Sequence, residues 1–452
     1  MAIRVLDRIP VSPPPGSVPA TTLPLTFFDA SWLFTGPVER LFFFSYPHPT
    51  PHFLSHHLPP LLSSLSLSLR SFFPLAGRVD RPLSSDPPAL SFSPSSHSLT
   101  LTLAESSADF DLLSGDSPRH FAELYSLVPQ LPPSSGDDDG DGDGSIPLAA
   151  VQVTVFPSRG ICVGLSVHHV ACDDSSSMHF VRSWAAACRL GGAEPPATAP
   201  PFYDRGVIAD PNGLCSKTLA EMRQLAANGP PPPPPEKPPL LIASFSLGRD
   251  WIEQLKQRVT AKAAENGLAI HSSTFVAACA FAWICLIKSQ RGFADKKSAH
   301  LLFSVECRSR LNPPIPEEYF GNCLRPCFVE AKMADLVEKD GVLAAAMAIG
   351  RAIKGLENGV LEGAEGWMQK ILSILPEGPM SVAGSPRFQV YGTDFGWGRP
   401  KKVDLPSIEK TPGTVSLAES SDEQGGVEIG LVLPKDEMDA FQSCFYDELK
   451  LF

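Results

Sequence analysis

The chain is organised around residues 161–177, Ile-Cys-Val-Gly-Leu-Ser-Val-His-His-Val-Ala-Cys-Asp-Asp-Ser-Ser-Ser. Every second residue from Ile161 to Val167 is apolar, the pattern of a strand with one apolar face. From Met178 onward apolar residues recur at helical spacing, so the stretch predicts a strand, a polar turn and a capped helix. His169 and Asp173 then lie in the turn, where strand ends commonly present reactive groups.

His169 is the candidate general base. A histidine titrates near neutral pH, and a neutral imidazole placed beside a hydroxyl accelerates proton removal by roughly 10²–10⁴-fold. The alternative is a core histidine bonded to a backbone carbonyl, a role for which His168 is equally eligible. The spacing His-x-x-x-Asp alone leaves both interpretations open.

Length and composition narrow the class of protein. With 452 residues, of which 43% are hydrophobic, the chain exceeds one ordinary core and predicts a globular protein of two or three domains. The first ten residues lack the apolar run of a secretory signal, so we expect a cytoplasmic monomer without a membrane segment. The net charge of −12 argues against a nucleic-acid partner but leaves room for an anionic small ligand in a local cationic pocket.

The sequence predicts no metal site. Ten cysteines are scattered through apolar segments without CxxC spacing, as expected for reduced thiols in a cytosolic protein. Cys323 and Cys327 have no neighbouring histidine with which to bind zinc. The acidic tract Asp137–Gly144 superficially resembles a calcium loop, but its twelfth position is Leu148 instead of Glu, which favours a solvated loop.

Two halves are expected on either side of a crossover. Residues 1–195 mix helical and strand patterns, residues 196–239 contain six consecutive prolines from Pro230 to Pro235, and residues 240–452 open with a strand. Within the second half, residues 300–310 read as a strand on which Glu306, Arg308 and Arg310 share one face. Two arginines directed one way are costly unless they meet buried acids or bind an anion.

Two motifs and several shorter segments resemble those of a known family. His169-Val-Ala-Cys-Asp173 and Asp394-Phe-Gly-Trp-Gly398, about 220 residues apart and in that order, resemble the two signature motifs of the plant BAHD acyl-CoA-dependent acyltransferases. Leu23–Asp29, Phe73–Arg78 and Val305–Arg310 fall where the family has similar segments. The segment Tyr319-Phe-Gly-Asn-Cys323 resembles the branch that acylates anthocyanins, flavonoids and other phenolic glycosides, often with malonyl-CoA.

The resemblance implies a fold and an activity. The fold would be α/β, with two chloramphenicol-acetyltransferase-like domains of mixed sheets and flanking helices around a channel. The activity would be transfer of an acyl group from acyl-CoA, the co-substrate, to a sugar hydroxyl of a flavonoid, anthocyanin or other phenolic glucoside. Malonyl is the acyl group that we expect first. His169 would deprotonate the hydroxyl without an acyl-enzyme, and no cofactor would be bound permanently. Alternatives are a hydroxycinnamoyl-CoA-dependent acyltransferase acting on a phenolic or amine acceptor, and a non-catalytic protein that binds CoA esters or a partner.

The resemblance also implies roles for single residues. Asp173 would pair with an arginine, for which Arg308 and Arg310 are the candidates. Asp394 is either a second proton acceptor or a structural carboxylate, and we favour the structural role. Trp397 either donates a hydrogen bond to the oxyanion that forms on the thioester carbonyl or only packs against its neighbours. The predicted CoA-binding residues are Lys256, Ser272, Ser273 and Thr274, with Arg182 and Arg40 as weaker candidates.

The sequence departs from the family pattern at two positions, Asp174 and Glu306. Asp174 stands where the family usually has Gly after the motif aspartate. The backbone of Asp174 would be strained if the turn needed a positive φ. The negative charge of Asp174 would also raise the pKa of His169. Glu306 stands where Asp is usual. A hydrolase centred on Cys172 is a further alternative, although its thiol would have to reach back to His169 across a tight turn.

Overall fold

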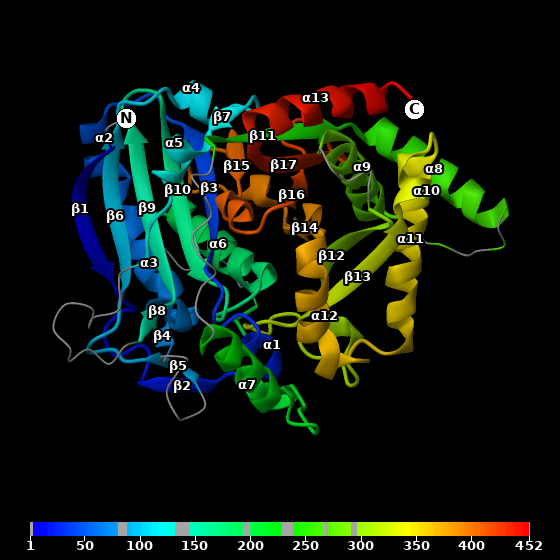
Figure 1. The fold of residues 1–452 in the computed structure, drawn as a ribbon. Coiled ribbons are helices and arrows are strands. Elements are labelled where there is room, and N and C mark those ends of the chain that lie inside the picture. Colours follow the sequence, from blue (N-terminus) through cyan, green and yellow to red (C-terminus); the bar gives the residue numbers. More distant parts are fainter. Residues whose placement is uncertain are drawn as a thin grey trace.

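The computed structural model describes residues 3–79, 88–131, 145–192, 199–227, 238–265, 267, 270, 272–290 and 296–451. The predicted loop Asp137–Gly144 and the proline run Pro230–Pro235 lie outside the described residues. Two large mixed sheets stand side by side, with the blue and cyan N-terminal strands in one and most of the green to red strands in the other (Figure 1).

The first sheet carries the strand of the motif near its middle. Its order is β1-β6-β9-β10-β3-β15, and only β6 and β9 run parallel among its neighbouring described strands. β9 and β10 form an antiparallel hairpin. The strands are β1 (Ile3–Val11), β6 (Leu99–Ser106), β9 (Ala149–Phe156), β10 (Gly160–His168), β3 (Pro37–Ser45) and β15 (Lys402–Asp404).

The second sheet belongs mainly to the C-terminal half. Its order is β13-β12-β14-β16-β17-β11-β7, with β14 parallel to both of its neighbours. The strands are β13 (Leu324–Lys332), β12 (Ser298–Glu306), β14 (Met380–Ala383), β16 (Thr414–Glu419), β17 (Val427–Pro434), β11 (Leu240–Leu247) and β7 (Arg119–His120). A small third sheet contains β2 (Thr21–Pro24), β5 (Ala89–Phe92), β4 (Arg78–Val79) and β8 (Ile146–Pro147).

Helices flank the sheets as the resemblance implied. In the first half these are α1 (Phe27–Ala30), α2 (Thr50–His56), α3 (Leu58–Ser71), α4 (Phe110–Leu113), α5 (Phe121–Tyr125), α6 (Asp174–Arg189) and, after it, α7 (Leu214–Ala227). The second half contributes α8 (Arg249–Glu265), α9 (Thr274–Ser289), α10 (Met333–Val337), α11 (Gly341–Gly355), α12 (Trp367–Ile374) and α13 (Lys435–Leu449). α9 is buried nearly all round.

Each half lends a strand to the other half's sheet. The short strand β7 pairs with β11, and β15 pairs with β3 (Figure 1). Arg119 of β7 donates two parallel hydrogen bonds to Asp404 of β15, at 2.8 and 3.0 Å, and both side chains are buried. This bidentate ion pair ties the exchanged strands together and fixes the two sheets relative to one another.

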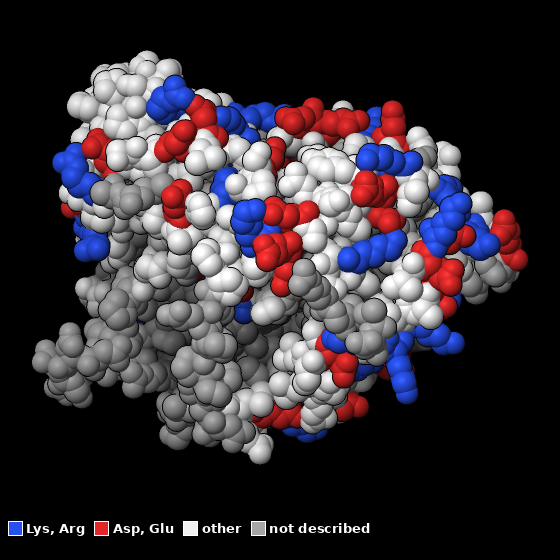
Figure 2. Space-filling model, turned by 45° about the horizontal axis from the view of Figure 1, so that its top comes forward, with Lys and Arg blue, Asp and Glu red and all other residues white. Residues whose placement is uncertain are grey.

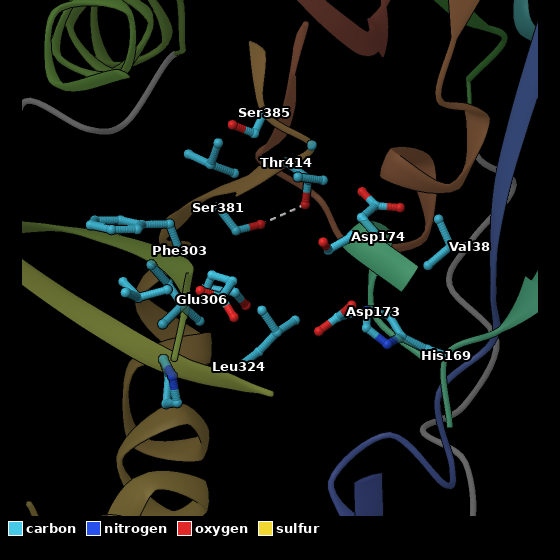
Figure 3. Close-up of a pocket in the computed structure, with 18 of the residues that line it drawn as sticks. Val38, His169, Asp173, Asp174, Phe303, Glu306, Leu324, Ser381, Ser385 and Thr414 are labelled. Atoms are coloured by element: carbon cyan, nitrogen blue, oxygen red, sulfur yellow. Dashed lines mark hydrogen bonds between the residues drawn. The ribbon is translucent and has the colours of Figure 1, made fainter. Parts of the chain in front are cut away.

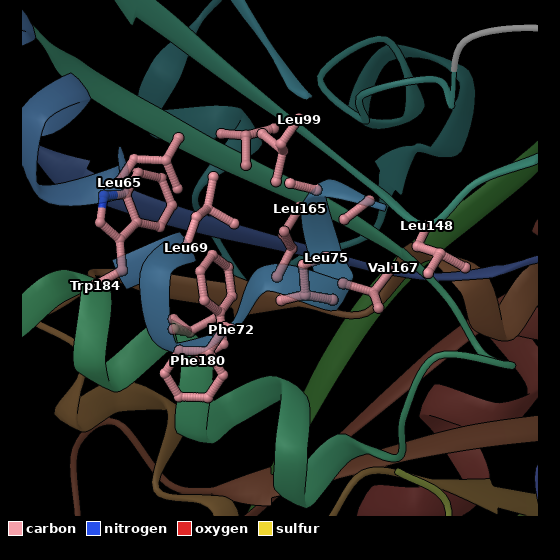
Figure 4. Packing of buried hydrophobic residues seen from close by; sticks show 14 of the residues in the cluster. Leu65, Leu69, Phe72, Leu75, Leu99, Leu148, Leu165, Val167, Phe180 and Trp184 are labelled. Carbon is pink, nitrogen blue, oxygen red and sulfur yellow. The ribbon is translucent and has the colours of Figure 1, made fainter. Parts of the chain in front are cut away.

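The core beside the motif strand is packed by two helices. Leu65 and Leu69 of α3 and Phe180 and Trp184 of α6 lie against Leu165 and its neighbours on β10 (Figure 4). The predicted apolar face of Ile161, Val163, Leu165 and Val167 lies in this core, and the opposite face of β10 is buried as well. The small residue Gly164 on the opposite face is required because a Cβ there would lie 2.6 Å from the carbonyl oxygen of Leu127.

Cysteine state, helix length and surface charge can be read from the described residues. The ten cysteines are all free thiols, and no group of three His, Cys, Asp or Glu side chains among the described residues has metal-binding geometry. No helix in the described part of the chain is long and apolar enough to cross a bilayer. On the face shown in Figure 2, acidic and basic side chains are interspersed.

Candidate active site

The motif strand ends where the sequence predicted. β10 stops at His168, and the carboxylate of Asp173 accepts a hydrogen bond from the backbone N–H of Ser176, which caps α6. α6 begins at Asp174, before the serines, because Asp173 takes the capping position. Asp174 is therefore helical, and the predicted backbone strain at this residue is absent.

Of the two adjacent histidines, His168 is the core residue. It is buried, the backbone N–H of Val170 donates to its Nδ1, and burial lowers its pKa to about 4. His169 instead lines the main cavity. The structure thus separates the two roles that the sequence left open.

Asn322 orients the His169 ring. The amide nitrogen of Asn322 donates to Asp29 Oδ1 at 3.0 Å and to the carbonyl oxygen of His169 at 2.9 Å. Its amide oxygen is therefore the atom that faces His169 Nδ1, 3.2 Å away. An amide oxygen only accepts, so Nδ1 carries the proton and Nε2 keeps the lone pair that a general base needs.

Asp29 anchors this arrangement from the first half of the chain. Its Oδ2 accepts from the backbone N–H of Thr26 at 2.9 Å in a capping box that opens α1, and its Oδ1 also accepts from the backbone N–H of Asn322 at 3.0 Å. Asp29 and Asn322 are fully buried. A buried network of hydrogen bonds through Asn322 and Asp29 thus holds the His169 ring, which is the kind of support that precise catalytic placement requires.

Trp32 covers one face of the imidazole. The two rings are parallel within 5°, with centroids 3.7 Å apart. Burial lowers the pKa of His169 below its usual value, and its backbone hydrogen bond and the charges of Asp174 and Asp173 raise it in part. The net direction keeps the ring neutral, and so able to accept a proton, at physiological pH.

Asp173 forms the predicted arginine pair, and the arginine is Arg308. Arg308 Nη1 lies 2.8 Å from Asp173 Oδ2, and the two side chains are 3% and 1% exposed. The carboxylate also accepts from the backbone N–H of Cys323. β12 ends at Glu306, and Arg308–Arg310 form a 3₁₀ turn, so the predicted strand through Arg310 was wrong. The turn directs Arg308 inward and leaves Arg310 exposed.

Asp174 makes a second ion pair beside the base. Its Oδ2 accepts from Arg40 Nη2 at 3.1 Å. Asp174 lines the main cavity, whereas Arg40 lines a small neighbouring one. The charge of Asp174 acts on His169 in the predicted direction, raising its pKa, but desolvation is the larger effect.

The cavity around His169 is formed by both halves of the chain. Its volume is about 2330 Å³, ample for two substrates, since pockets for drug-sized ligands measure about 300–1,000 Å³. Val38, His169 and Asp174 form one side, and Phe303 and Leu324 form the other (Figure 3). Ser381 and Thr414 share a hydrogen bond of 2.6 Å at its wall.

The second motif lies away from this cavity. Asp394 Oδ1 accepts from the backbone N–H groups of Gly396 and Gly398, at 2.7 and 3.0 Å, and neither Asp394 nor Trp397 lines the cavity. Gly396 and Gly398 have φ of 99° and 89°, which glycine adopts without strain. The turn geometry favours a structural role for Asp394.

Trp397 uses its single donor elsewhere. Its indole N–H donates to His57 Nδ1 at 3.1 Å, and its ring packs against Phe44, Phe53 and Phe395. An indole has only one N–H, so this arrangement does not supply the predicted oxyanion donor. The packing alternative agrees with these contacts.

The predicted CoA-binding residues are divided between the cavity and its surroundings. Ser273, Thr274 and Arg182 line the cavity, and Ser273 caps α9. Ser272 is buried beside them, and its hydroxyl has no hydrogen-bond partner among the described residues. Lys256 does not line the cavity, and its Nζ lies 2.9 Å from Oε1 of Glu253 on α8. Arg40 does not line the cavity either, because it pairs with the far side of Asp174. The start of α9 therefore remains the best candidate for phosphate contacts.

Cys172 is unsuited to nucleophilic catalysis. The side chain is buried, and burial raises the pKa of its thiol well above the usual value, with Asp173 and Asp174 adding to the shift. A thiol in such surroundings stays protonated and inert. The predicted hydrolase alternative thus lacks an activated nucleophile.

Sequence reasoning missed two side chains that contact His169. Asn322 was part of the Tyr319–Cys323 segment but had no role, and Trp32 had none either. The only local signal for Asn322 is a polar residue in an otherwise apolar segment that precedes a strand. Both residues meet His169 through tertiary contacts.

Comparisons with known proteins identify the family of this chain. The model of the Transferase family matches residues 9–448. Coumaroyl-CoA:anthocyanidin 3-O-glucoside-6''-O-coumaroyltransferase 1 of Arabidopsis thaliana is 38% identical, covering 99% of this chain and 98% of its own. Phenolic glucoside malonyltransferase 2 of the same plant is 37% identical, with 99% and 100% covered. The malonyl-coenzyme:anthocyanin 5-O-glucoside-6'''-O-malonyltransferase of Salvia splendens is 36% identical, with 96% and 93% covered.

Solved structures show the same fold. Vinorine synthase superimposes with a TM-score of 0.69 at 20% identity, covering 97% of this chain and 96% of its own. F. sporotrichioides TRI101 complexed with coenzyme A and T-2 superimposes with a TM-score of 0.63 at 15% identity, with 94% and 97% covered. The predicted two-domain, chloramphenicol-acetyltransferase-like α/β fold is therefore confirmed. The chain, which matches the family over almost its whole length, belongs to the BAHD transferase family and is an acyl-CoA-dependent acyltransferase.

Proposed function

We propose that this protein transfers an acyl group from a CoA thioester to a sugar hydroxyl of a phenolic or anthocyanin glucoside, with His169 as the general base. The observation that carries the proposal is the His169–Asn322 contact, which leaves Nε2 of a cavity-lining imidazole unprotonated. The relatives that match almost the full length of the chain act on glucosides of this class by name.

The chemical steps follow from this geometry. His169 Nε2 takes the proton of the acceptor hydroxyl as its oxygen attacks the thioester carbonyl. The tetrahedral intermediate then collapses, the C–S bond breaks, and the imidazolium returns its proton to the departing CoA sulfur. Asn322 accepts from Nδ1 throughout, so the ring keeps its orientation. Because Cys172 is a buried, protonated thiol, direct transfer is favoured over an acyl-enzyme.

Malonyl and coumaroyl groups are both represented among the relatives, and both donors enter the test. A phenolic or amine acceptor for a hydroxycinnamoyl group is the second candidate reaction. The cytoplasmic, monomeric state expected from the sequence stays a prediction.

The test is an incubation of the purified protein with p-coumaroyl-CoA or malonyl-CoA and a panel of anthocyanin and phenolic glucosides. Acceptor-dependent release of free CoA thiol, with an acylated glucoside identified by mass spectrometry, is the expected result. Thiol release without an acceptor would instead support hydrolysis. Absence of thiol release with both donors, together with donor binding, would support the non-catalytic alternative and overturn the proposal.

A further inference from the structure

The charges beside the base bear on which acyl group this site accepts. Two arginines, Arg40 and Arg308, contact three carboxylates in the wall of the cavity: Arg40 pairs with Asp174, and Arg308 pairs with both Asp173 and Glu306. Two positive against three negative charges leave a formal charge of −1 in this group. The wall nearest the base is therefore acidic.

Neither arginine of this group is available to an anionic ligand. Arg308 is 3% exposed, and its N–H groups are occupied by the two carboxylates, the Ser176 hydroxyl and backbone carbonyls. Arg40 is 8% exposed and lies outside the lining of the main cavity, whereas Asp174 is 19% exposed and lies within it. The Arg40–Asp174 pair thus presents its negative end to the substrates.

The reaction geometry brings the acyl group to this wall. The thioester carbonyl must approach to about 3–3.5 Å from the acceptor oxygen that is hydrogen-bonded to His169. In a malonyl group, the free carboxylate carbon is only two C–C bonds from that carbonyl carbon, a span of about 2.5 Å. A second carboxylate on such a donor would therefore lie among the acids of this wall. An uncharged acyl group meets no such repulsion.

The other cations at this end of the cavity are held elsewhere. Lys410 is paired with Glu39 at 2.7 Å and donates to the carbonyl oxygen of Pro37, so it adds no net positive charge. On α6, the arginine nearest to Asp174 lies too far along the helix. Arg182 follows Asp174 by eight residues, which is about 12 Å along the axis of α6. Its Nη1 donates to the carbonyl oxygen of Phe388 at 2.9 Å. On the opposite side of the cavity, the apolar side chains of Phe303 and Leu324 offer surface to an uncharged, planar acyl chain (Figure 3).

We propose that Asp174 makes the acyl subsite select CoA thioesters whose acyl group carries no second carboxylate, so that hydroxycinnamoyl-type donors are used in preference to malonyl-CoA. This inference rests on the proposed function and replaces the malonyl preference expected from the sequence. Like charges within a few ångströms in a partly buried site weaken binding by on the order of tenfold or more, even with a neighbouring cation.

The test compares malonyl-CoA with its uncharged methyl ester, a donor of the same chain length, and with p-coumaroyl-CoA. We expect kcat/KM of the wild type to favour the ester over malonyl-CoA by at least about tenfold. In Asp174→Asn, the cavity wall loses one negative charge and the charge of Arg40 is no longer neutralised, so the ratio should fall to within about threefold. Glu221→Gln, which removes a cavity acid on α7, should leave the ratio unchanged within about twofold.

A second variant guards against misfolding. Asp174→Asn leaves Arg40 buried without a partner, whereas Asp174→Asn combined with Arg40→Met leaves no unpaired charge and should fold. It should also reduce the preference for the ester. A wild type that prefers malonyl-CoA, or a preference that neither variant alters, overturns the inference.

Calorimetric binding separates this inference from the proposed function. If no donor is turned over with any acceptor, the proposed function fails, but the affinities of malonyl-CoA and its methyl ester still measure the effect of the charge. Tighter binding of the ester in the wild type, lost in the variants, supports the selection by Asp174. Equal affinities overturn it.

Discussion

Replacing Asp173 by Asn tests whether the motif carboxylate holds the site together or takes part in proton transfer. The side chain is 1% exposed and contacts Arg308, the backbone N–H of Ser176 and that of Cys323. Asn keeps the size and the helix cap but removes the charge, which leaves Arg308 with Glu306 as its remaining carboxylate partner. Breaking one partner of a buried ion pair costs about 3–5 kcal/mol.

The structure separates the expected effects on stability and on catalysis. A loss of about 3–5 kcal/mol lowers the ratio of folded to unfolded protein by roughly 10²–10³·⁵-fold, which moves the urea midpoint measured by circular dichroism. The turnover number per folded molecule should fall by less than about tenfold, because the hydrogen bonds of Asp173 hold Arg308 and the turn, while Asn322 orients His169.

A double-mutant cycle sharpens the test. Asp173→Asn with Arg308→Met removes both charges, so its loss of stability should be smaller than the sum of the two single losses. Additive losses would contradict the buried-pair reasoning. A turnover number reduced more than about a hundredfold at an unchanged urea midpoint would place Asp173 in the proton transfer and refute the structural assignment.

Three further results are expected. His169→Ala should lower the turnover number by about 10²–10⁴-fold with little change in the urea midpoint, and undiminished transfer would remove the proposed base. Because burial lowers the pKa of His169, the base stays neutral as the pH falls, so the acid limb of kcat/KM should lie below pH ~6.5; a limb above that value would contradict this environment. Cys172→Ala should keep acyl transfer within about threefold, measured as thiol release, and loss of turnover in a folded variant would revive the nucleophilic alternative.

Local patterns in the sequence predicted much of the fold. The capped helix after β10 and the strand that opens residues 240–452 were both confirmed, because side-chain period and capping are encoded over a few neighbouring residues. The pairing of β1 with β6 was not predicted, because the partner residues 99–106 lie far beyond any local sequence window.

The site divides in the same way. The sequence by itself determined the two ordered motifs, the candidate base and the need of Arg308 or Arg310 for a buried partner, since each follows from residue type and spacing. Only the tertiary structure decided that Asn322 faces His169 across 153 positions of sequence, that Trp32 stacks on the ring, and that Asp174 holds Arg40 out of the cavity. These contacts depend on how two sheets with exchanged strands pack together. The free energy of that packing is spread over the whole core, so the sequence around any one residue carries no local pattern that would predict these contacts.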